Sequence, residues 1–351
     1  MTDNELFINN DLKDKKKTMK NYRNRSINNT STPWIEKYRP MTIDELSINE
    51  NTYNKISKII DDKDMPNIII TGLPGIGKTT TILCIAKALM GRYYSQGVLE
   101  LNASDDRGIK AVQEVIIYFC KKKLDNMIKD DKYANHKIIL LDEADNMTKK
   151  AQQLINNLME KHHDTTRFAL TCNNSSKIIE AIQSRCIIFR YKRLDRNNIV
   201  NRLQFICKEE NVLYTNKGLD ALVLTAQGDM RQAINNLQLT YNGYKKITSK
   251  NVYKLCDRPH PLIIKKMFIA CNNKDIKNAL LLLDKLRNDG YSSSDIALSM
   301  KNILKIDSLQ ELSNDTKIKY MIEIGKTAIK ISRGVDSPLQ LTGCVCKLCH
   351  I

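Results

Sequence analysis

The spacing of apolar residues divides the chain into a first part, in which strands alternate with helices, and a second part that is wholly helical. Short apolar runs rich in β-branched residues predict five buried strands, at 67–71, 98–101, 137–141, 167–172 and 186–189. The segments between them carry apolar residues at helical spacing. This alternation predicts an α/β fold with a five-stranded parallel sheet covered on both faces, which binds its ligand at the carboxyl ends of the strands.

Segments outside the sheet complete the predicted organisation. Residues 1–32 are rich in Asn, Lys, Asp and Ser and have almost no apolar period, which is typical of a disordered tail, here a basic one. A fixed, extended segment is expected at 33–40, where the single tryptophan lies between two prolines. After residue 193, helices are expected at 199–210, 216–226, 229–241, 262–272, 274–289, 293–306, 313–332 and 335–349. A Pro-His-Pro break at 259–261 is a candidate domain boundary.

A glycine-rich stretch after the first strand predicts a phosphate-binding loop. It consists of Gly72, Leu73, Pro74, Gly75, Ile76, Gly77, Lys78 and Thr79, and Thr80 opens the helical pattern that follows. Glycines let successive backbone N–H groups turn toward a triphosphate, and the start of the next helix adds positive partial charge. The lysine would reach the β- and γ-phosphates and the threonine hydroxyl would bind Mg²⁺. A glycine turn that happens to precede a lysine is the alternative, and the strand and helix on either side disfavour it.

Polar side chains follow other predicted strands. Asp142 and Glu143 close the third strand, where Asp142 would hold Mg²⁺ through water and Glu143 would polarise the attacking water. Asn173 ends the next strand beside the expected γ-phosphate, and Arg231 starts a later helix that would fold over the phosphates. Taken singly, these residues also suit surface acids, a loop-capping asparagine and an exposed arginine. Together with the phosphate loop they favour a nucleotide hydrolase.

Arg185 is a different kind of candidate, because it precedes the fifth strand. It is therefore expected on the side of the sheet away from the chain's own phosphate loop, where it would reach a neighbour's nucleotide better than its own. An arginine supplied in trans stabilises transition-state charge and makes hydrolysis depend on assembly.

Composition favours a polyanionic partner. The formal net charge is +17, and lysine-rich surfaces bind phosphate backbones by releasing counterions, although lysines that only solvate helices would give the same charge. Ten cysteines without a secretory signal predict reduced thiols in an intracellular compartment. No apolar run approaches the length of about 18 residues that a membrane span needs, so no membrane partner is expected.

Several motifs together resemble a known family. They lie at 34–40 (WIEKYRP), in the phosphate loop, and at 99–108 (LELNASDDRG), 141–145 (LDEAD), 175–180 (SSKIIE), 183–186 (QSRC) and 228–233 (GDMRQA). From about residue 34 to its end, the chain is similar to the small subunits of replication factor C. These subunits belong to the AAA+ ATPases and build the clamp loader of eukaryotic and archaeal DNA replication. The combination of Ser-Arg-Cys with Glu-Lys-Tyr-Arg-Pro is highly specific, since other AAA+ groups rarely combine them.

This resemblance implies a fold, a reaction and partners. It implies an AAA+ nucleotide-binding domain over 33–193, a small helical lid domain over 194–257 and an all-helical collar over 258–351 that joins subunits into a pentameric ring. Such a ring uses ATP to open a PCNA-type sliding clamp and to load it onto primer-template DNA. The backbone of Tyr38 and Arg39 would lie against adenine, and Arg185 would be the arginine finger of an adjacent subunit. The residues implied to track the phosphates of one DNA strand are Arg107, Lys110, Lys149 and Lys177; each would also suit a solvated surface.

Some alternatives stay open. Another AAA+ DNA motor of the branch-migration type would need to translocate along DNA, and a non-hydrolysing subunit would bind ATP only to hold the ring together.

Asn156 and Asn157 stand where the family usually has two arginines. Cys344, Cys346, Cys349 and His350 match haem-attachment and zinc patterns, but four ligands from one helix suit a metal poorly, so packing is favoured. Ring position, homo- or hetero-oligomer, and nucleus or cytoplasmic replication site are left open.

Overall fold

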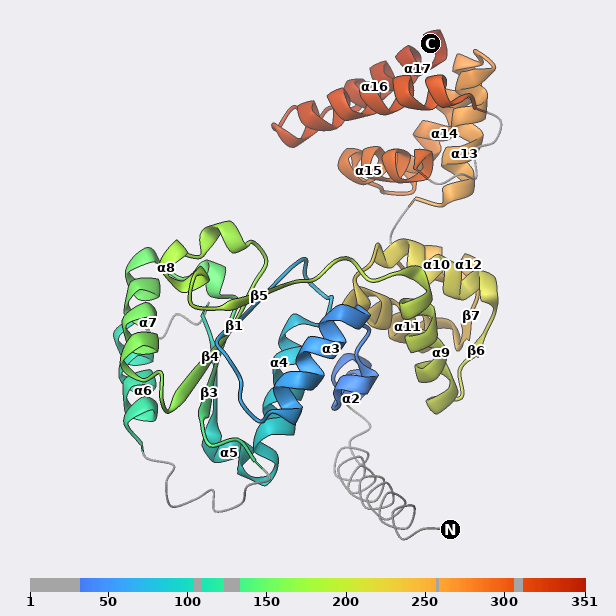
Figure 1. Ribbon diagram of the computed structural model, residues 1–351. Helices are drawn as coiled ribbons and strands as arrows, with labels where there is room; N and C mark the ends of the chain where they lie inside the picture. The colour runs from blue at the N-terminus through green and yellow to red at the C-terminus, as the bar shows by residue number, and fades with distance from the viewer. Residues whose placement is uncertain (1–31, 104–108, 123–132, 257–258, 306–311) are drawn as a thin grey trace. The chain divides into compact units, whose positions relative to one another are not determined.

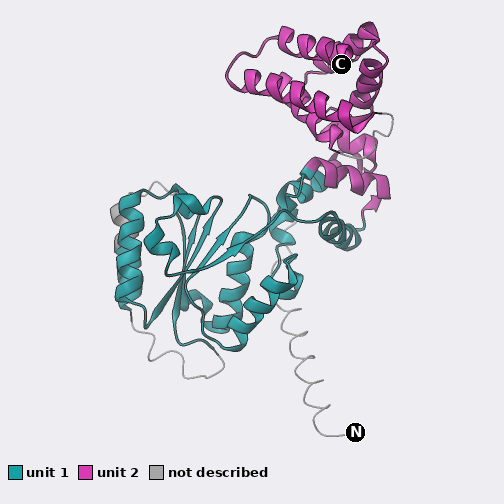
Figure 2. Cartoon of the chain, turned by 45° about the horizontal axis from the view of Figure 1, so that its top comes forward, with its two compact units in different colours: residues 1–211, 226–238 teal, residues 212–225, 239–351 magenta. Residues whose placement is uncertain are grey.

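The computed structural model describes residues 32–103, 109–122, 133–256, 259–305 and 312–351 (Figure 1). They fall into two compact units (Figure 2). The first unit ends at Asn211 and also includes Ala226–Gln238, and the second comprises Val212–Thr225 and Leu239–Ile351. The boundary between these units runs through the expected lid, so the division into domains at 193 and 257 stays a prediction. Apart from residue 32, the expected tail lies outside the described residues.

Five parallel strands form the sheet of the first unit. They are β1 (Ile68–Thr71), β2 (Val98–Asn102), β3 (Lys137–Asp142), β4 (Thr166–Cys172) and β5 (Ile187–Arg190). Their order is β2-β3-β4-β1-β5, so the strand that precedes the phosphate loop lies between β4 and β5. The α/β fold and the five strands are confirmed, each strand within one residue of its expected bounds.

Helices cover both faces of this sheet (Figure 1). On one face, α3 (Glu50–Asp61) and α4 (Lys78–Met90) pack with Ile68 and Ile70 of β1. On the other face, α6 (Ile109–Lys121), α7 (Lys149–Lys161) and α8 (Glu180–Gln183) pack with Ile69. Successive side chains of a strand point to opposite faces. Burial on both faces explains why these strands are unbroken apolar runs rather than alternating patterns.

The segment at 33–40 is not extended as expected, because it begins with the short helix α2 (Trp34–Lys37). The carbonyl of Pro33 accepts hydrogen bonds from the N–H groups of Glu36 and Lys37, both at 3.0 Å. Trp34 is buried, and its backbone N–H donates to Oε1 of Gln238 at 3.0 Å. A proline before the first helical residue is compatible with a helical turn, since its fixed φ suits the start of a helix and no backbone N–H is needed there.

The second unit is mainly helical. It contains β6 (Leu213–Tyr214), β7 (Lys246–Ile247), α12 (Ser249–Leu255), α13 (Pro261–Asn272), α14 (Ile276–Asn288), α15 (Ser293–Leu304), α16 (Asn314–Ser332) and α17 (Pro338–His350). The helices α10 (Asn216–Ala226) and α11 (Met230–Tyr244) cross between the units. The expectation of a wholly helical part is wrong at β6 and β7, which pair in parallel. Strands of two residues are too short to leave a period in the sequence.

One core joins helices α13 to α17. Its fully buried side chains include Phe268, Leu283 and Val345, and it also contains Cys344 and Cys349. Among the described residues, no three or more His, Cys, Asp or Glu side chains lie close enough together to hold a metal ion. In the same part of the chain, every helix is too short or too polar to cross a membrane.

Candidate nucleotide-binding site

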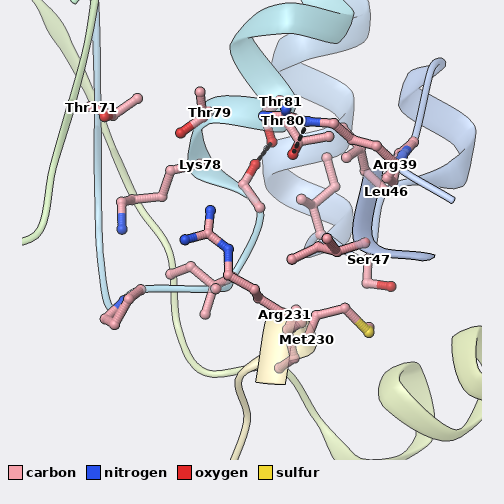
Figure 3. Close-up of a pocket in the computed structure, with 18 of the residues that line it drawn as sticks. Arg39, Leu46, Ser47, Lys78, Thr79, Thr80, Thr81, Thr171, Met230 and Arg231 are labelled. Atoms are coloured by element: carbon pink, nitrogen blue, oxygen red, sulfur yellow. Dashed lines mark hydrogen bonds between the residues drawn. The ribbon is translucent and has the colours of Figure 1, made fainter. Parts of the chain in front are cut away.

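A pocket of the first unit lies at the carboxyl ends of β1, β3 and β4 (Figure 3). The phosphate loop supplies one wall, and residues at the carboxyl ends of β3 and β4 supply another. Further lining residues come from α2, from the segment after it, and from α9 (Arg196–Glu209) and α11. The lining includes Tyr38, Arg39, Pro74, Gly75, Ile76, Gly77, Lys78, Thr79, Thr80, Asp142, Glu143, Asn173 and Arg231. Most of the residues predicted to contact nucleotide or metal therefore meet in one place.

Two glycines give the phosphate loop its course. Gly75 and Gly77 have φ of +70° and +93°, in the left-handed region that favours glycine, and Gly77 caps the start of α4. A Cβ at Gly75 would come 1.8 Å from Oδ1 of Asp229, so the carboxylate packs directly on the glycine. The N–H of Met230 donates to the Gly75 carbonyl at 3.0 Å. The first residue of α11 is thereby tied to the loop.

Lys78 is fixed by three neutral oxygens. Its Nζ donates to the carbonyls of Gly72 and Leu73, both at 2.8 Å, and to Oδ1 of Asn173 at 2.9 Å. Gly72 and Leu73, which were predicted to contact nucleotide, are not among the lining residues and act on the pocket through this lysine. Burial lowers the pKa of Lys78, and the nearby Asp142 opposes that shift. An anion in the pocket would oppose the same shift, because a nearby negative charge favours the protonated lysine.

A hydroxyl network holds Asp142, the last residue of β3, and Glu143, which follows it. The Thr79 hydroxyl donates to the Asp142 carboxylate, with both oxygens at 3.0 Å. The Thr171 hydroxyl also donates to Asp142, and it accepts the Glu143 N–H at 3.1 Å. Glu143 has φ of +54°, and its carboxylate accepts from Nδ2 of Asn146 at 3.2 Å. A left-handed backbone at a residue other than glycine persists only where its surroundings enforce it.

Sequence reasoning missed Thr171, which is fully buried in β4. In the register of the sheet, Leu141 pairs with Leu170, so Thr171 is opposite Asp142. That pairing becomes visible only when the strand order is known. The hydroxyl and carboxylate oxygens of Thr79 and Asp142 are the kind of ligands that Mg²⁺ prefers, so this donor set fits the predicted metal.

The end of the pocket away from Lys78 joins α2 to α9. The Tyr38 carbonyl accepts a hydrogen bond from Arg202 of α9, and the Tyr38 hydroxyl donates to Oε1 of Glu210 at 2.6 Å. Arg39 Nε lies 3.4 Å from the Thr80 hydroxyl (Figure 3). Arg202 lines the pocket as well, and sequence reasoning missed it because a helical arginine carries no local signal. The contacts of Tyr38 and Arg39 with adenine stay predictions.

Arg231 enters the pocket from α11. Its guanidinium points toward the side where Lys78 and Thr79 lie (Figure 3). Its positive charge contributes to lowering the pKa of Lys78, which places both cations in one electrostatic environment. Two cations at the end of a phosphate loop suit a polyphosphate.

Arg185 lies elsewhere in the same unit. The strand that follows it begins beside the residue before β1, because the Ile187 N–H donates to the Asn67 carbonyl at 2.8 Å. The strands are parallel, so Arg185 is at the amino edge of the sheet, whereas the pocket is at the carboxyl edge. Its side chain is 39% exposed. The arginine is thus separated from the chain's own pocket, as the sequence predicts.

Two of the four residues predicted to contact DNA, Lys149 and Lys177, are exposed and belong to neighbouring segments. Lys149 begins α7 after the capping Thr148, and Lys177 ends a short 3₁₀ turn. Gln152 joins these segments, since its amide donates to the Lys177 carbonyl at 3.1 Å. The side chain of Lys110 and the whole of Arg107 lie outside the described residues. All four DNA contacts stay predictions.

Comparisons with known proteins decide the family. The family model "Replication factor C C-terminal domain" matches residues 259–347, and "ATPase family associated with various cellular activities (AAA)" matches 68–194. "Probable replication factor C subunit 2" of Dictyostelium discoideum is 47% identical and covers 91% of this chain and 92% of its own. "Replication factor C subunit 4" of Schizosaccharomyces pombe is 48% identical, with 90% of each chain covered. The chain belongs to the replication factor C subunit family.

This replication factor C family member therefore carries an AAA-family ATPase domain, matched over residues 68–194. Among solved structures, two variants of Thermotoga maritima RuvB match with a TM-score of 0.50 at 15% and 14% identity. They cover 66% of this chain and 78% and 79% of their own. At that identity the likeness shows a shared fold alone.

Proposed function

We propose that this chain is a small subunit of the replication factor C clamp loader. It uses ATP binding and hydrolysis to open a sliding clamp and load it onto primer-template DNA. The proposal is carried by one observation in a member of this family: the pocket residues expected to bind ATP lie apart from the arginine expected to act on it. The pocket brings Lys78, Asp142 and Glu143 together, while Arg185 lies at the opposite edge of the sheet.

Within the pocket, each side chain has a separate task. Lys78 neutralises the β- and γ-phosphates, and Arg231 approaches the same phosphates from α11. Thr79 and Asp142 would hold Mg²⁺, which would neutralise phosphate charge when it is bound. Glu143 polarises the attacking water, and Asn173 orients that water without adding charge. The assignment is supported by the hydrogen bonds that fix Lys78, Asp142 and the Glu143 backbone.

The neighbouring subunits complete the reaction. Arg185 contacts the ATP of an adjacent subunit, so hydrolysis requires assembly into a ring with other clamp-loader subunits. The cations Lys149 and Lys177, together with Arg107 and Lys110, follow the phosphates of one DNA strand. A net charge of +17 supports a polyanionic partner. The protein works inside the cell where DNA is replicated, in the nucleus or at a cytoplasmic replication site.

The test is the ATP turnover of the chain assembled with its partner subunits, measured with and without sliding clamp and primer-template DNA. We expect clamp and DNA together to stimulate ATP turnover. Lys78→Met should abolish the ATP turnover at this subunit's pocket. Displacement of a DNA strand at the cost of ATP would instead indicate a branch-migration motor. A loader that assembles and loads clamps with this subunit's pocket unable to turn over ATP would indicate a purely structural subunit.

A further inference from the structure

The Arg185 guanidinium is held by two contacts from its own subunit. Nη1 donates to the carbonyl of Ala181 in α8 at 2.9 Å. Nη2 donates to Oε1 of Glu160, near the end of α7. These contacts come from two different helices, so they fix the plane of the guanidinium as well as its position.

Glu160 is itself oriented by a neighbour on α7. Nδ2 of Asn156, one helical turn earlier, donates to the same Oε1 at 3.2 Å. Asn156 is only 8% exposed, so this amide has little freedom to turn away. The opposite amide orientation would place two acceptor oxygens against each other. A neutral amide can orient the carboxylate without competing with Arg185 for its charge, whereas a cation at this spacing would pair with it.

The two contacts leave Arg185 with N–H donors that can still bind phosphate. A guanidinium has five N–H donors, and the contacts with Ala181 and Glu160 use two of them. About three donors are left for the phosphate oxygens of a neighbour. A contact that inhibited Arg185 would have to occupy the remaining N–H donors of the guanidinium as well.

The Glu160 contact adds little to the stability of the isolated chain. The Arg185 and Glu160 side chains are 39% and 49% exposed, and ion pairs with this exposure contribute about 0–1 kcal/mol. A neighbouring subunit that covers the pair would exclude water and strengthen the interaction. Its effect is therefore expected in the assembled particle, at the step where the arginine meets developing charge.

We propose that Glu160 is a positioning residue for Arg185 and aims it at the ATP of the adjacent subunit. This inference rests on the proposed function, in which Arg185 acts in trans. The carboxylate limits the rotamers of a long side chain before assembly, so less ordering is needed in the transition state. Removing it lowers the rate of hydrolysis at the neighbour's site without weakening ATP binding there.

The experiment uses the loader assembled from full-length subunits, with clamp and primer-template DNA, and measures kcat and KM for ATP. Glu160→Ala is expected to lower kcat by about 10-fold with KM changed by less than about 2-fold. Glu160→Gln keeps an acceptor oxygen and is expected to retain more activity. The matched control is Glu180→Gln, which removes the same charge from an exposed position of α8 and should leave kcat unchanged.

A double-variant comparison separates positioning from a structural role. In the Arg185→Ala loader, adding Glu160→Ala should change kcat no further, because there is no arginine left to aim. Equal kcat for wild type and Glu160→Ala, with Arg185→Ala impaired, would overturn this inference and leave the proposed function standing. A higher kcat in Glu160→Ala would also overturn it, since Glu160 would then restrain the arginine. No effect of Arg185→Ala would instead overturn the proposed function. If Glu160→Ala assembles poorly, the nearly isosteric Glu160→Gln decides alone: its kcat should lie below that of wild type, and an equal kcat would overturn the inference.

Discussion

Replacing Gly75 by alanine tests how the phosphate loop holds helix α11. Gly75 has φ of +70°, and the added Cβ would come 1.8 Å from Oδ1 of Asp229. The Asp229 carboxylate would have to rotate away and would lose the hydrogen bond that it accepts from the Gln232 N–H at 3.0 Å. The bond from the Met230 N–H to the Gly75 carbonyl, also 3.0 Å, would be disturbed as well.

Three effects of similar size contribute to the loss of stability. A left-handed backbone with a side chain costs about 1 kcal/mol, the lost helix cap about 1 kcal/mol, and the disturbed hydrogen bond about 1 kcal/mol. Gly77→Ala is the matched control, because Gly77 has φ of +93° and nothing lies within 4 Å of its Cβ position. At about 2–4 °C per kcal/mol, we expect Tm to fall by about 2–4 °C for Gly77→Ala and about 6–12 °C for Gly75→Ala.

The assay is thermal unfolding of the nucleotide-free chain, followed by circular dichroism. Asp229→Ala removes the atoms that meet the new Cβ. Alone it should lower Tm through the lost cap, and in the Gly75→Ala chain it should lower Tm no further. Equal shifts for Gly75→Ala and Gly77→Ala would show that the contact with Asp229 does not contribute, and so would additive effects of Gly75→Ala and Asp229→Ala.

Three further predictions concern buried polar groups of the first unit. Lys137 is 1% exposed and its Nζ donates to the carbonyls of Phe119, Cys120 and Lys122 at 2.6, 2.8 and 2.6 Å. Lys137→Met should therefore lower the free energy of unfolding by about 3 kcal/mol in denaturant titrations, whereas Lys150→Met, at an exposed position, should not. Burial, aided by Arg167 and opposed by Asp64, lowers the pKa of His136 from 6.5 to about 4. As the pH falls, His136 is therefore protonated in the unfolded chain before it is protonated in the folded chain. The stability present above pH 6.5 is lost toward pH 4, by about 3 kcal/mol. In His136→Asn, the slope of the unfolding free energy against pH should be shallower. Thr171→Val should lower kcat by about 10-fold at unchanged KM for ATP, because the hydroxyl that fixes Asp142 and the Glu143 backbone is gone; an unchanged kcat in single-turnover assays would contradict the role given to that hydroxyl.

Most of the fold was predictable because its elements carry strong local signals. The sheet strands are continuous apolar runs, and the helices of the second unit have clear periods and local caps, such as Ser292 for α15 and Ser313 for α16. The exceptions are elements too short to have a period. The strands β6 and β7 have two residues each, and α2 has four. Long-range contacts, such as that of Trp34 with Gln238, decide such elements.

The candidate site was predictable where chemistry follows from adjacent residues. The phosphate loop and the pair Asp142 and Glu143 have fixed local spacing, so they could be recognised without a structure. Thr171, Arg202 and Glu160 could not, because each acts on a residue that is distant in sequence. Glu160, for example, contacts Arg185 only because α7 and α8 pack on the same face of the sheet.

In the proposed function, Arg185 completes the ATP site of a neighbouring subunit. The most direct measurement compares wild-type and Arg185→Ala chains in two assays, the affinity of the isolated chain for ATP and the ATP turnover of the assembled, DNA-bound loader. We expect equal affinity, because Arg185 lies away from the chain's own pocket, and a turnover at the neighbour's site that falls by about 1,000-fold or more. Unchanged turnover, or a loss of affinity in the isolated chain, would rule out a role of Arg185 in trans.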